Sequence, residues 1–199
     1  HDVRLVADVE LAGSGQPVRV KGESKITEAR GRVKRIWLEP NNPLAFPPTL
    51  QAILSADLVV VGPGSLYTSI LPNLLVPDIA EAIKASRAIK FFICNVATQV
   101  GETSGYTCGD HLDTLVRHLG SNPFDVMICN NSFARKLAPG VEWVKPEPDL
   151  DKRVSVYFAD LVNEENPWRH DDDKLARAVM DLFYERTGPL SSREDLPSA

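Results

Sequence analysis

Residues 56–70 read Ala-Asp-Leu-Val-Val-Val-Gly-Pro-Gly-Ser-Leu-Tyr-Thr-Ser-Ile, and this stretch indicates the fold class of the whole chain. Its short apolar run, Leu58–Val61, is rich in β-branched residues and stops abruptly at a turn of glycine, proline and serine. Such a run between turn formers is typical of a parallel strand that is buried on both faces of an α/β sheet.

The turn at residues 62–65 would then lie at the carboxyl end of a parallel strand, where open α/β sheets bind their ligands. Glycines allow the backbone to approach a ligand closely, and Ser65 can cap a following helix whose free N–H groups attract anions. Residues 62–67 therefore indicate a site for a phosphate-bearing small molecule. A Gly-Pro-Gly sequence by itself can also be no more than a tight turn.

The chain then repeats the alternation of strand and helix. Apolar runs at residues 89–96 and 124–129 predict two more buried strands, and the helical spacing of apolar residues predicts helices at 77–87 and 107–119. This order predicts an α/β protein with a Rossmann-like, doubly wound and mainly parallel sheet.

Two alternating segments before the first parallel strand, residues 3–11 and 17–21, predict a β-hairpin. Residues 22–26 are expected to form a polar connection. We therefore expect a single Rossmann-like domain over residues 1–190 with the β-hairpin as an insertion. The polar residues 191–199 are expected to form a disordered tail.

The composition excludes several classes of function. The chain has 199 residues, of which 43% are hydrophobic and 25% charged, and its net charge of −5 argues against binding to nucleic acid or to a membrane surface. No apolar run approaches the ~20 residues that a membrane helix needs. Three cysteines without a Cys-x-x-Cys pair predict small core residues in a reducing cytoplasm, and these are Cys94, Cys108 and Cys129.

Loops that leave the carboxyl ends of the three predicted parallel strands meet at one edge of the sheet. They supply backbone N–H groups, amides, hydroxyls, aromatic rings and one carboxylate, which suits a polar ligand with phosphates and a ring or sugar. The candidate ligand-binding residues are Gly62, Pro63, Gly64, Ser65, Leu66, Tyr67, Asn95, Thr98, Gln99, Glu102, Tyr106, Asn130 and Arg135.

Each of these residue types also has a purely structural interpretation. Asparagines often close a strand by bonding nearby backbone, and Tyr106 can simply pack its ring with its hydroxyl in water. Arg135 can be a solvated surface residue, whereas as a ligand-binding residue its guanidinium would form a fork on a phosphate.

The sequence predicts no catalytic residue and no metal site. His111 and His118 lie seven residues apart on one predicted helix, but no third ligand accompanies them. His170 next to Asp171 could act as a base, although such a pair more often belongs to the start of a helix.

Three motifs in order resemble the gluconeogenesis factor family, the YvcK-like proteins of the CofD-like superfamily. They are residues 62–74 (Gly-Pro-Gly-Ser-Leu-Tyr-Thr-Ser-Ile-Leu-Pro-Asn-Leu), residues 101–107 (Gly-Glu-Thr-Ser-Gly-Tyr-Thr) with Asp110 and His111, and residues 22–26 (Gly-Glu-Ser-Lys-Ile). The resemblance implies a Rossmann-like fold and a cytoplasmic regulator of carbon metabolism, cell shape and envelope synthesis. It also implies that UDP-N-acetylglucosamine is the ligand, that Tyr106 and Arg135 contact it, and that no further cofactor is required.

The chain departs from the family pattern in two places. It lacks the Gly-Gly-Gly-Thr-Gly turn and the Asp-Asp-Gly-Gly stretch of family members, so we expect an N-terminally truncated fragment that lacks part of the nucleotide site. Asp78 occupies a position that is usually glycine in relatives, where it adds a charge that the start of a helix tolerates.

Two other classes of function remain open. The other branch of the superfamily transfers a phospholactyl group to a deazaflavin with Mg²⁺, which needs carboxylates beside the phosphates. Glu102 is the lone carboxylate in the three loops, and the sequences of the motifs are closer to those of the regulator branch. The chain could also be a scaffold for regulatory protein partners or a homo-oligomer, with the UDP-sugar as a switch.

Overall fold

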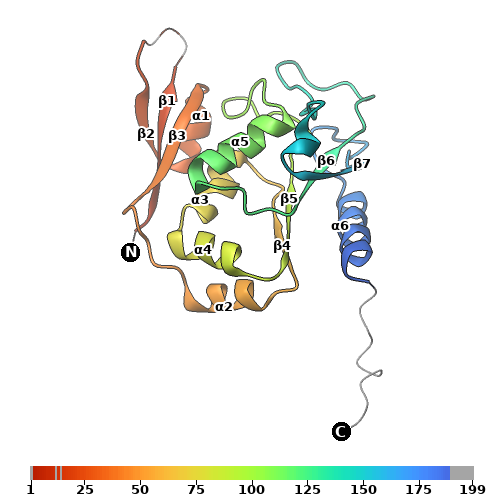
Figure 1. The fold of residues 1–199 in the computed structure, drawn as a ribbon. Helices are drawn as coiled ribbons and strands as arrows, with labels where there is room; N and C mark the ends of the chain where they lie inside the picture. The colour runs from red at the N-terminus through yellow and green to blue at the C-terminus, as the bar shows by residue number, and fades with distance from the viewer. Residues whose placement is uncertain (1, 12, 14, 189–199) are drawn as a thin grey trace.

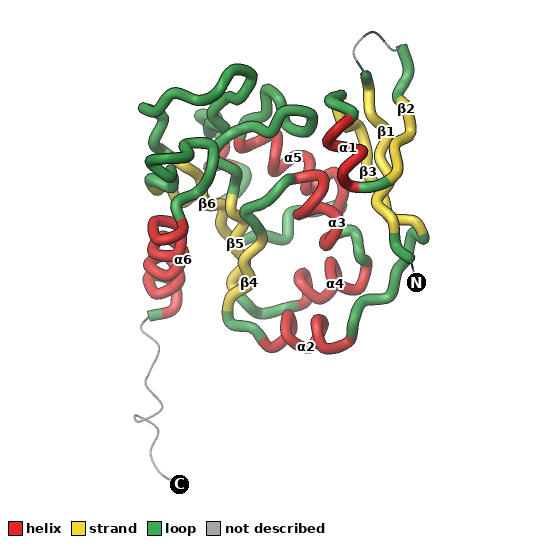
Figure 2. Tube along the Cα trace, turned by 180° about the vertical axis from the view of Figure 1, so that it is seen from behind, coloured by secondary structure: helices red, strands yellow, loops and turns green. Residues whose placement is uncertain are grey.

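The computed structural model describes residues 2–11, 13 and 15–188. Their strands form two sheets, a three-stranded sheet in the order β2-β1-β3 and a four-stranded sheet in the order β4-β5-β6-β7. The helices α3, α4 and α5 lie between the two sheets, and α6 lies on the far side of the four-stranded sheet (Figures 1 and 2). The α/β class with helices on both faces of a parallel sheet is confirmed.

The three-stranded sheet consists of β1 (Arg4–Glu10), β2 (Val18–Lys21) and β3 (Arg32–Glu39), and both pairings are antiparallel. The predicted hairpin is therefore present, and β3 extends it on the other side of β1. The prediction of a polar connection at residues 22–26 is wrong, because helix α1 (Glu23–Glu28) forms there. Ile26 is fully buried, and this one apolar anchor holds the short polar helix against the core.

The four-stranded sheet consists of β4 (Leu58–Val61), β5 (Ile89–Ile93), β6 (Val126–Asn130) and β7 (Ser155–Ala159), all parallel. Every residue of β6 is buried, as expected of a central strand. Burial of β4 on both faces is a wrong prediction, because β4 is an edge strand of this sheet and Val60 is 41% exposed. A local apolar run does not encode whether a strand has one neighbour or two.

The connecting segments supply the remaining helices. These are α2 (Pro47–Ser55), the π-helix η1 (Leu66–Ile70), α3 (Leu71–Leu74), α4 (Pro77–Ala85), α5 (Cys108–Leu119), the 3-10 helix η2 (Leu150–Lys152) and α6 (Asp172–Thr187). Helix α5 starts with a capping box, in which Thr107 and Asp110 each bond the other's backbone N–H group. It ends at Gly120, whose φ of 78° is left-handed.

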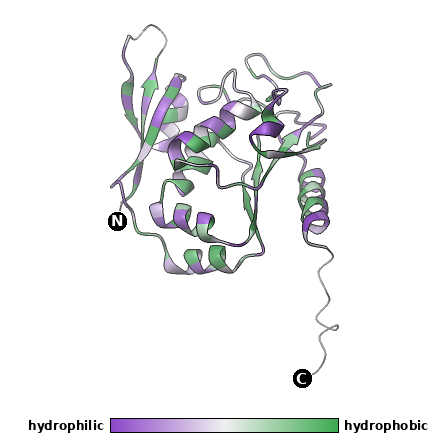
Figure 3. Ribbon diagram, viewed as in Figure 1, coloured by the Kyte–Doolittle hydropathy of each residue, from purple (hydrophilic) through white to green (hydrophobic). Residues whose placement is uncertain are grey.

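The alternation of side chains along the parallel strands divides the apolar interior into two clusters. Phe91, Ile93 and Ile128 pack with α6, whereas Phe92 and Met127 pack on the opposite face with α4 and α5. Figure 3 shows the strands of this sheet coloured mainly as hydrophobic. The sheet is thus covered on both faces, which leaves its carboxyl-end edge as the place where polar loops gather.

Cys94, Cys108 and Cys129 are free and buried, as the sequence predicts. Helices long and apolar enough to cross a membrane are lacking among the described residues. The extent of the domain, residues 1–190, stays a prediction, and the predicted tail at 191–199 lies outside the described residues.

Candidate functional site

A cavity of about 700 Å³ lies at the carboxyl ends of the parallel strands. Its lining comes from four connections that are far apart in the sequence: the turn after β4, the loop after β5, the loop after β6 and the segment between β7 and α6. We call it the carboxyl-end cavity, and its lining residues are Pro63, Gly64, Ser65, 95–100, Val141, Trp168, Arg169, His170 and Asp172.

Gly62 fixes the entry to the turn after β4. Its φ is +90°, and an added Cβ would lie 2.9 Å from the carbonyl oxygen of Ile93 at the end of β5. A side chain at this position would therefore meet both backbone strain and a collision with the neighbouring strand. Glycine lets the chain leave β4 close to β5 and places the next residues at the cavity.

The turn offers two unused donors. Within the described part of the chain, the N–H groups of Gly64 and Ser65 have no hydrogen-bond partner, whereas the Ser65 carbonyl accepts from the N–H groups of Ser69 and Ile70. The expected cap by the Ser65 side chain is absent, since its hydroxyl instead donates to Gln99 Oε1 at 2.7 Å. The two backbone N–H groups can donate to an anion in the cavity.

The loop after β5 is tied to this turn by side-chain hydrogen bonds. Asn95 Nδ2 donates to the carbonyl oxygen of Gly64 at 3.0 Å. Thr98 Oγ1 accepts from the N–H group of Glu142 at 2.9 Å, which joins the loop after β5 to the loop after β6. The structure therefore brings together the predicted site residues Pro63, Gly64, Ser65, Asn95, Thr98 and Gln99.

Glu102 braces the same loop from inside the protein. Its side chain is buried, and Oε1 accepts from Thr27 Oγ1 and Thr68 Oγ1 at 2.8 Å each and from Gln99 Nε2 at 3.3 Å. Oε2 is buried without a partner among the described residues. Glu102 does not line the carboxyl-end cavity, and its contacts join α1 and η1 to the loop.

Tyr67 and Tyr106 form a hydroxyl pair 2.6 Å apart, beside the site but outside the cavity lining. Burial raises the pKa of Tyr67 far above its ordinary value, and the bond to Tyr106 adds to this rise. Tyr106 also meets the ring of His111 edge-on, and it lines a separate cavity of about 110 Å³ beside Asp110 and Arg117. Leu66 is buried in the core.

Two other predicted residues lie away from the lining. Asn130 is buried, and its Oδ1 accepts from the N–H groups of Ser132 and Leu161 at 3.2 Å each, so it organises the ends of the loops after β6 and β7. The Arg135 side chain is 55% exposed and lies 3.4 Å from Glu164 in an ion pair.

The segment between β7 and α6 also belongs to this site, although the sequence did not predict it there. Trp168, Arg169 and His170 line the cavity, and His170 Nε2 lies 3.1 Å from the carbonyl oxygen of Cys94. Burial lowers the pKa of His170 below its ordinary value. The signal that could have found this segment is the apolar pattern of residues 153–158. Taken as a fourth parallel strand, these residues would have placed the segment that follows them at the same edge of the sheet.

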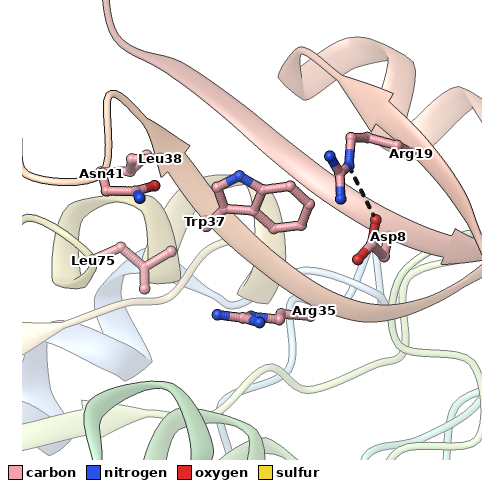
Figure 4. A pocket seen from close by; sticks show the side chains of 7 residues that line it. All are labelled: Asp8, Arg19, Arg35, Trp37, Leu38, Asn41 and Leu75. Atoms are coloured by element: carbon pink, nitrogen blue, oxygen red, sulfur yellow. Dashed lines mark hydrogen bonds and ion pairs between the residues drawn. The ribbon is translucent and has the colours of Figure 1, made fainter.

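A second cavity, of about 400 Å³, lies on the three-stranded sheet (Figure 4). We call it the sheet-face cavity; its lining residues are Asp8, Arg19, Arg35, Trp37, Leu38, Asn41 and Leu75. The Arg19 guanidinium lies 4.9 Å from the centre of the Trp37 ring and 3.5 Å from Asp8, and Arg35 lies 6.0 Å from the same ring. This cavity is built from charged side chains around one aromatic ring.

The fold is that of an α/β protein with its cavity at the carboxyl end of a parallel sheet. Residues 1–180 match the family described as 2-phospho-L-lactate transferase CofD, and the chain belongs to this family.

Among curated relatives, the gluconeogenesis factor of Halalkalibacterium halodurans is 39% identical over 173 residues, which cover 81% of this chain and 53% of that protein. The gluconeogenesis factor of Bacillus subtilis is 39% identical over 181 residues, covering 83% of this chain and 55% of that protein. A crystal structure of a UPF0052 family member from Bacillus halodurans superposes with a TM-score of 0.77 at 36% identity, covering 89% of this chain and 58% of the other. The chain thus spans little more than half the length of these relatives.

Proposed function

We propose that this chain is the ligand-binding portion of a cytoplasmic regulator of carbon metabolism, cell shape and envelope synthesis, and that it binds UDP-N-acetylglucosamine. The names of the curated relatives support the link to gluconeogenesis, and the motifs at residues 62–74 and 101–107 imply the ligand. These relatives are longer proteins, and the proposal extends their role to this chain.

The observation that carries the proposal is the pair of unused N–H groups on Gly64 and Ser65 beside a cavity of about 700 Å³. A diphosphate needs donors that converge without a large rearrangement, and backbone N–H groups in a fixed turn supply them. Asn95, Thr98 and Gln99 surround these donors with polar groups, and Trp168 provides an aromatic surface for a ring. A nucleotide joined to a sugar contains each of these ligand chemistries.

Calorimetric titration of the chain with UDP-N-acetylglucosamine tests this proposal. Asn95→Ala removes the hydrogen bond that fixes the Gly64 carbonyl, and we expect affinity to fall about tenfold, or about 1.4 kcal/mol. Arg19→Ala, in the sheet-face cavity, is the matched control and should bind as the unchanged chain does. Equal affinity in the chain and in Asn95→Ala would contradict the placement of the ligand.

The proposed roles of Arg135 and Tyr106 need a separate measurement, because neither lines the cavity. The sequence predicts that Arg135→Ala costs about thirtyfold in affinity, roughly 2 kcal/mol. Such a loss would mean that the bound ligand extends from the cavity to Arg135. Unchanged affinity would confine the site to the cavity lining and leave Arg135 as a surface partner of Glu164.

The description of the family favours a second candidate, transfer of a phospholactyl group to a deazaflavin with Mg²⁺. Mg²⁺ in such sites is held by one or two carboxylates together with substrate phosphates. Asp172 is the single carboxylate among the lining residues, and no group of three or more His, Cys, Asp or Glu in the described chain is arranged to hold a metal ion. This donor set meets only the minimum for Mg²⁺, and tight deazaflavin binding would favour the transferase.

A further inference from the structure

The segment between β7 and α6 forms one wall of the carboxyl-end cavity and is held firmly in place. The N–H group of Asp171 donates to the Leu161 carbonyl at 2.8 Å, and that of Asn163 donates to the Arg169 carbonyl at 3.1 Å. The Asp171 side chain accepts from the N–H group of Lys174 at 3.0 Å and so caps α6. The wall is therefore a built part of the site.

The hydrogen bond of His170 determines which ring nitrogen carries the proton. The Cys94 carbonyl can only accept, so Nε2 must donate across the 3.1 Å contact. Burial lowers the pKa of His170, which keeps the ring neutral near pH 7. Nδ1 then carries a lone pair, and within the described chain no hydrogen bond satisfies it.

Trp168 lies two residues before His170 in the same wall, and it is 48% exposed although its indole is large and apolar. An exposed indole that lines a cavity offers a flat face on which a planar ring can stack. A stacking face together with an unsatisfied acceptor suits a heterocycle that carries an N–H donor in its plane.

We propose that this wall recognises a pyrimidine base, with Trp168 against the face of the ring and His170 Nδ1 accepting from the imide N3–H of uracil. The inference rests on the proposed binding of a UDP-sugar in this cavity and assigns its base end. Uracil presents a donor at N3, whereas cytosine presents an acceptor there, which would face the His170 lone pair. The site should therefore prefer uridine to cytidine nucleotides, because an acceptor left facing an acceptor loses its hydrogen bond.

The test is calorimetric titration of the chain and its variants with UDP and with CDP. We expect the unchanged chain to bind UDP at least tenfold more tightly than CDP. In His170→Gln, the amide nitrogen can still donate to the Cys94 carbonyl, but the acceptor at the Nδ1 position is removed. Affinity for UDP should fall about tenfold, affinity for CDP should stay the same, and the preference should disappear.

His170→Asn serves as the rescue variant, because its amide oxygen can occupy the position of Nδ1 and should restore part of the preference. Trp168→Ala should weaken UDP and CDP equally, by about tenfold, while Trp168→Phe should retain most of the affinity. Thermal unfolding of each variant confirms that it is folded.

The outcomes separate the two proposals. If UDP binds and His170→Gln leaves the preference for UDP unchanged, the assignment of His170 is wrong while the proposed ligand class stands. If UDP and CDP bind the unchanged chain equally, the base is not recognised by this wall. If the chain binds neither UDP, CDP nor UDP-N-acetylglucosamine, both the assignment and the proposed function fail.

Discussion

The carboxyl-end cavity and the sheet-face cavity show two different ways of placing polar groups on one molecule. The first gathers backbone groups and mainly uncharged side chains from four distant connections, and hydrogen bonds hold the side chains of Ser65, Asn95, Thr98 and Gln99 in place. The second places charged side chains around Trp37 on strands that are adjacent in the sheet. Exposed charges move and are screened by water, whereas braced groups stay in position for a ligand.

The comparison implies that substitutions of residues that hold the loops of the carboxyl-end cavity in position have large effects on stability. Substitutions on the sheet face should have small ones. The largest effect is expected for Gly62→Ala, since the new Cβ would lie 2.9 Å from the Ile93 carbonyl at a φ of +90°. We expect a loss of about 3 kcal/mol in the free energy of unfolding.

Gly105→Ala is the matched control for this substitution. Gly105 also has a positive φ, +75°, but an added Cβ would meet nothing within 4 Å. Only the backbone strain remains, about 1 kcal/mol. Urea unfolding of both variants measures the difference, and equal losses would show that the approach of β4 to β5 is not tight.

The second largest effect is expected for Glu102→Leu. This change leaves the Thr27 and Thr68 hydroxyls without their common acceptor in a buried place, at a cost of about 2 kcal/mol. Glu102→Gln retains an oxygen that can accept from both hydroxyls and should lose less than half as much. Denaturant unfolding checks the order, and a Gln variant as unstable as the Leu variant would mean that a negative charge is needed at this position.

An intermediate effect is expected from pH. Burial lowers the pKa values of His111, His118 and His170 below the ordinary histidine value of about 6.5, so the unfolded chain binds protons more readily than the folded chain does. The stability that these neutral rings contribute is present above about pH 6.5 and is lost as the pH falls, by at most about 1.4 kcal/mol per pH unit for each histidine.

Thermal unfolding between pH 7.5 and 5.5 should therefore show a falling midpoint temperature. His111→Asn can keep the donor that His111 Nδ1 provides to the Thr107 carbonyl but cannot titrate, so its stability should fall less steeply with acid. The same slope in both proteins would show that His111 does not contribute to it.

The smallest effect is expected on the sheet face. Arg19→Ala removes an exposed ion pair with Asp8 and a cation–π contact with Trp37, each worth about 1 kcal/mol or less. Its salt dependence distinguishes it from the changes above: 0.5 M NaCl should reduce the difference from the unchanged chain. A loss above 2 kcal/mol would show that the sheet face is as firmly braced as the carboxyl-end cavity.

Local sequence patterns predicted those parts of the fold that depend on neighbouring residues. The run at Leu58–Val61, the helix at Cys108–Leu119 with its Thr107 and Asp110 cap, and the hairpin all follow from periodicity and from turn or capping residues. Helix α1 was missed because its single buried anchor, Ile26, gives no periodic signal in six residues.

The site was predicted only in part, because sequence indicates where strands end but not where the side chains of the following loops point. Strand ends place Gly64, Ser65, Asn95 and Gln99 together, because parallel strands align their carboxyl ends. Sequence does not reveal which side of a loop a side chain takes, so it did not foresee that Tyr106 would bond Tyr67 and line another cavity. His170 enters the site through β7, whose partly exposed residues give a weaker strand pattern than the buried β6 does.

The most direct test of the account is an amide chemical-shift titration of the isotope-labelled chain with UDP-N-acetylglucosamine. The account predicts the largest shifts at Gly64, Ser65 and the Trp168–His170 wall, with no shift at Arg19, Arg35 or Trp37. Saturable shifts centred on Trp37, with Gly64 and Ser65 unmoved, would contradict it.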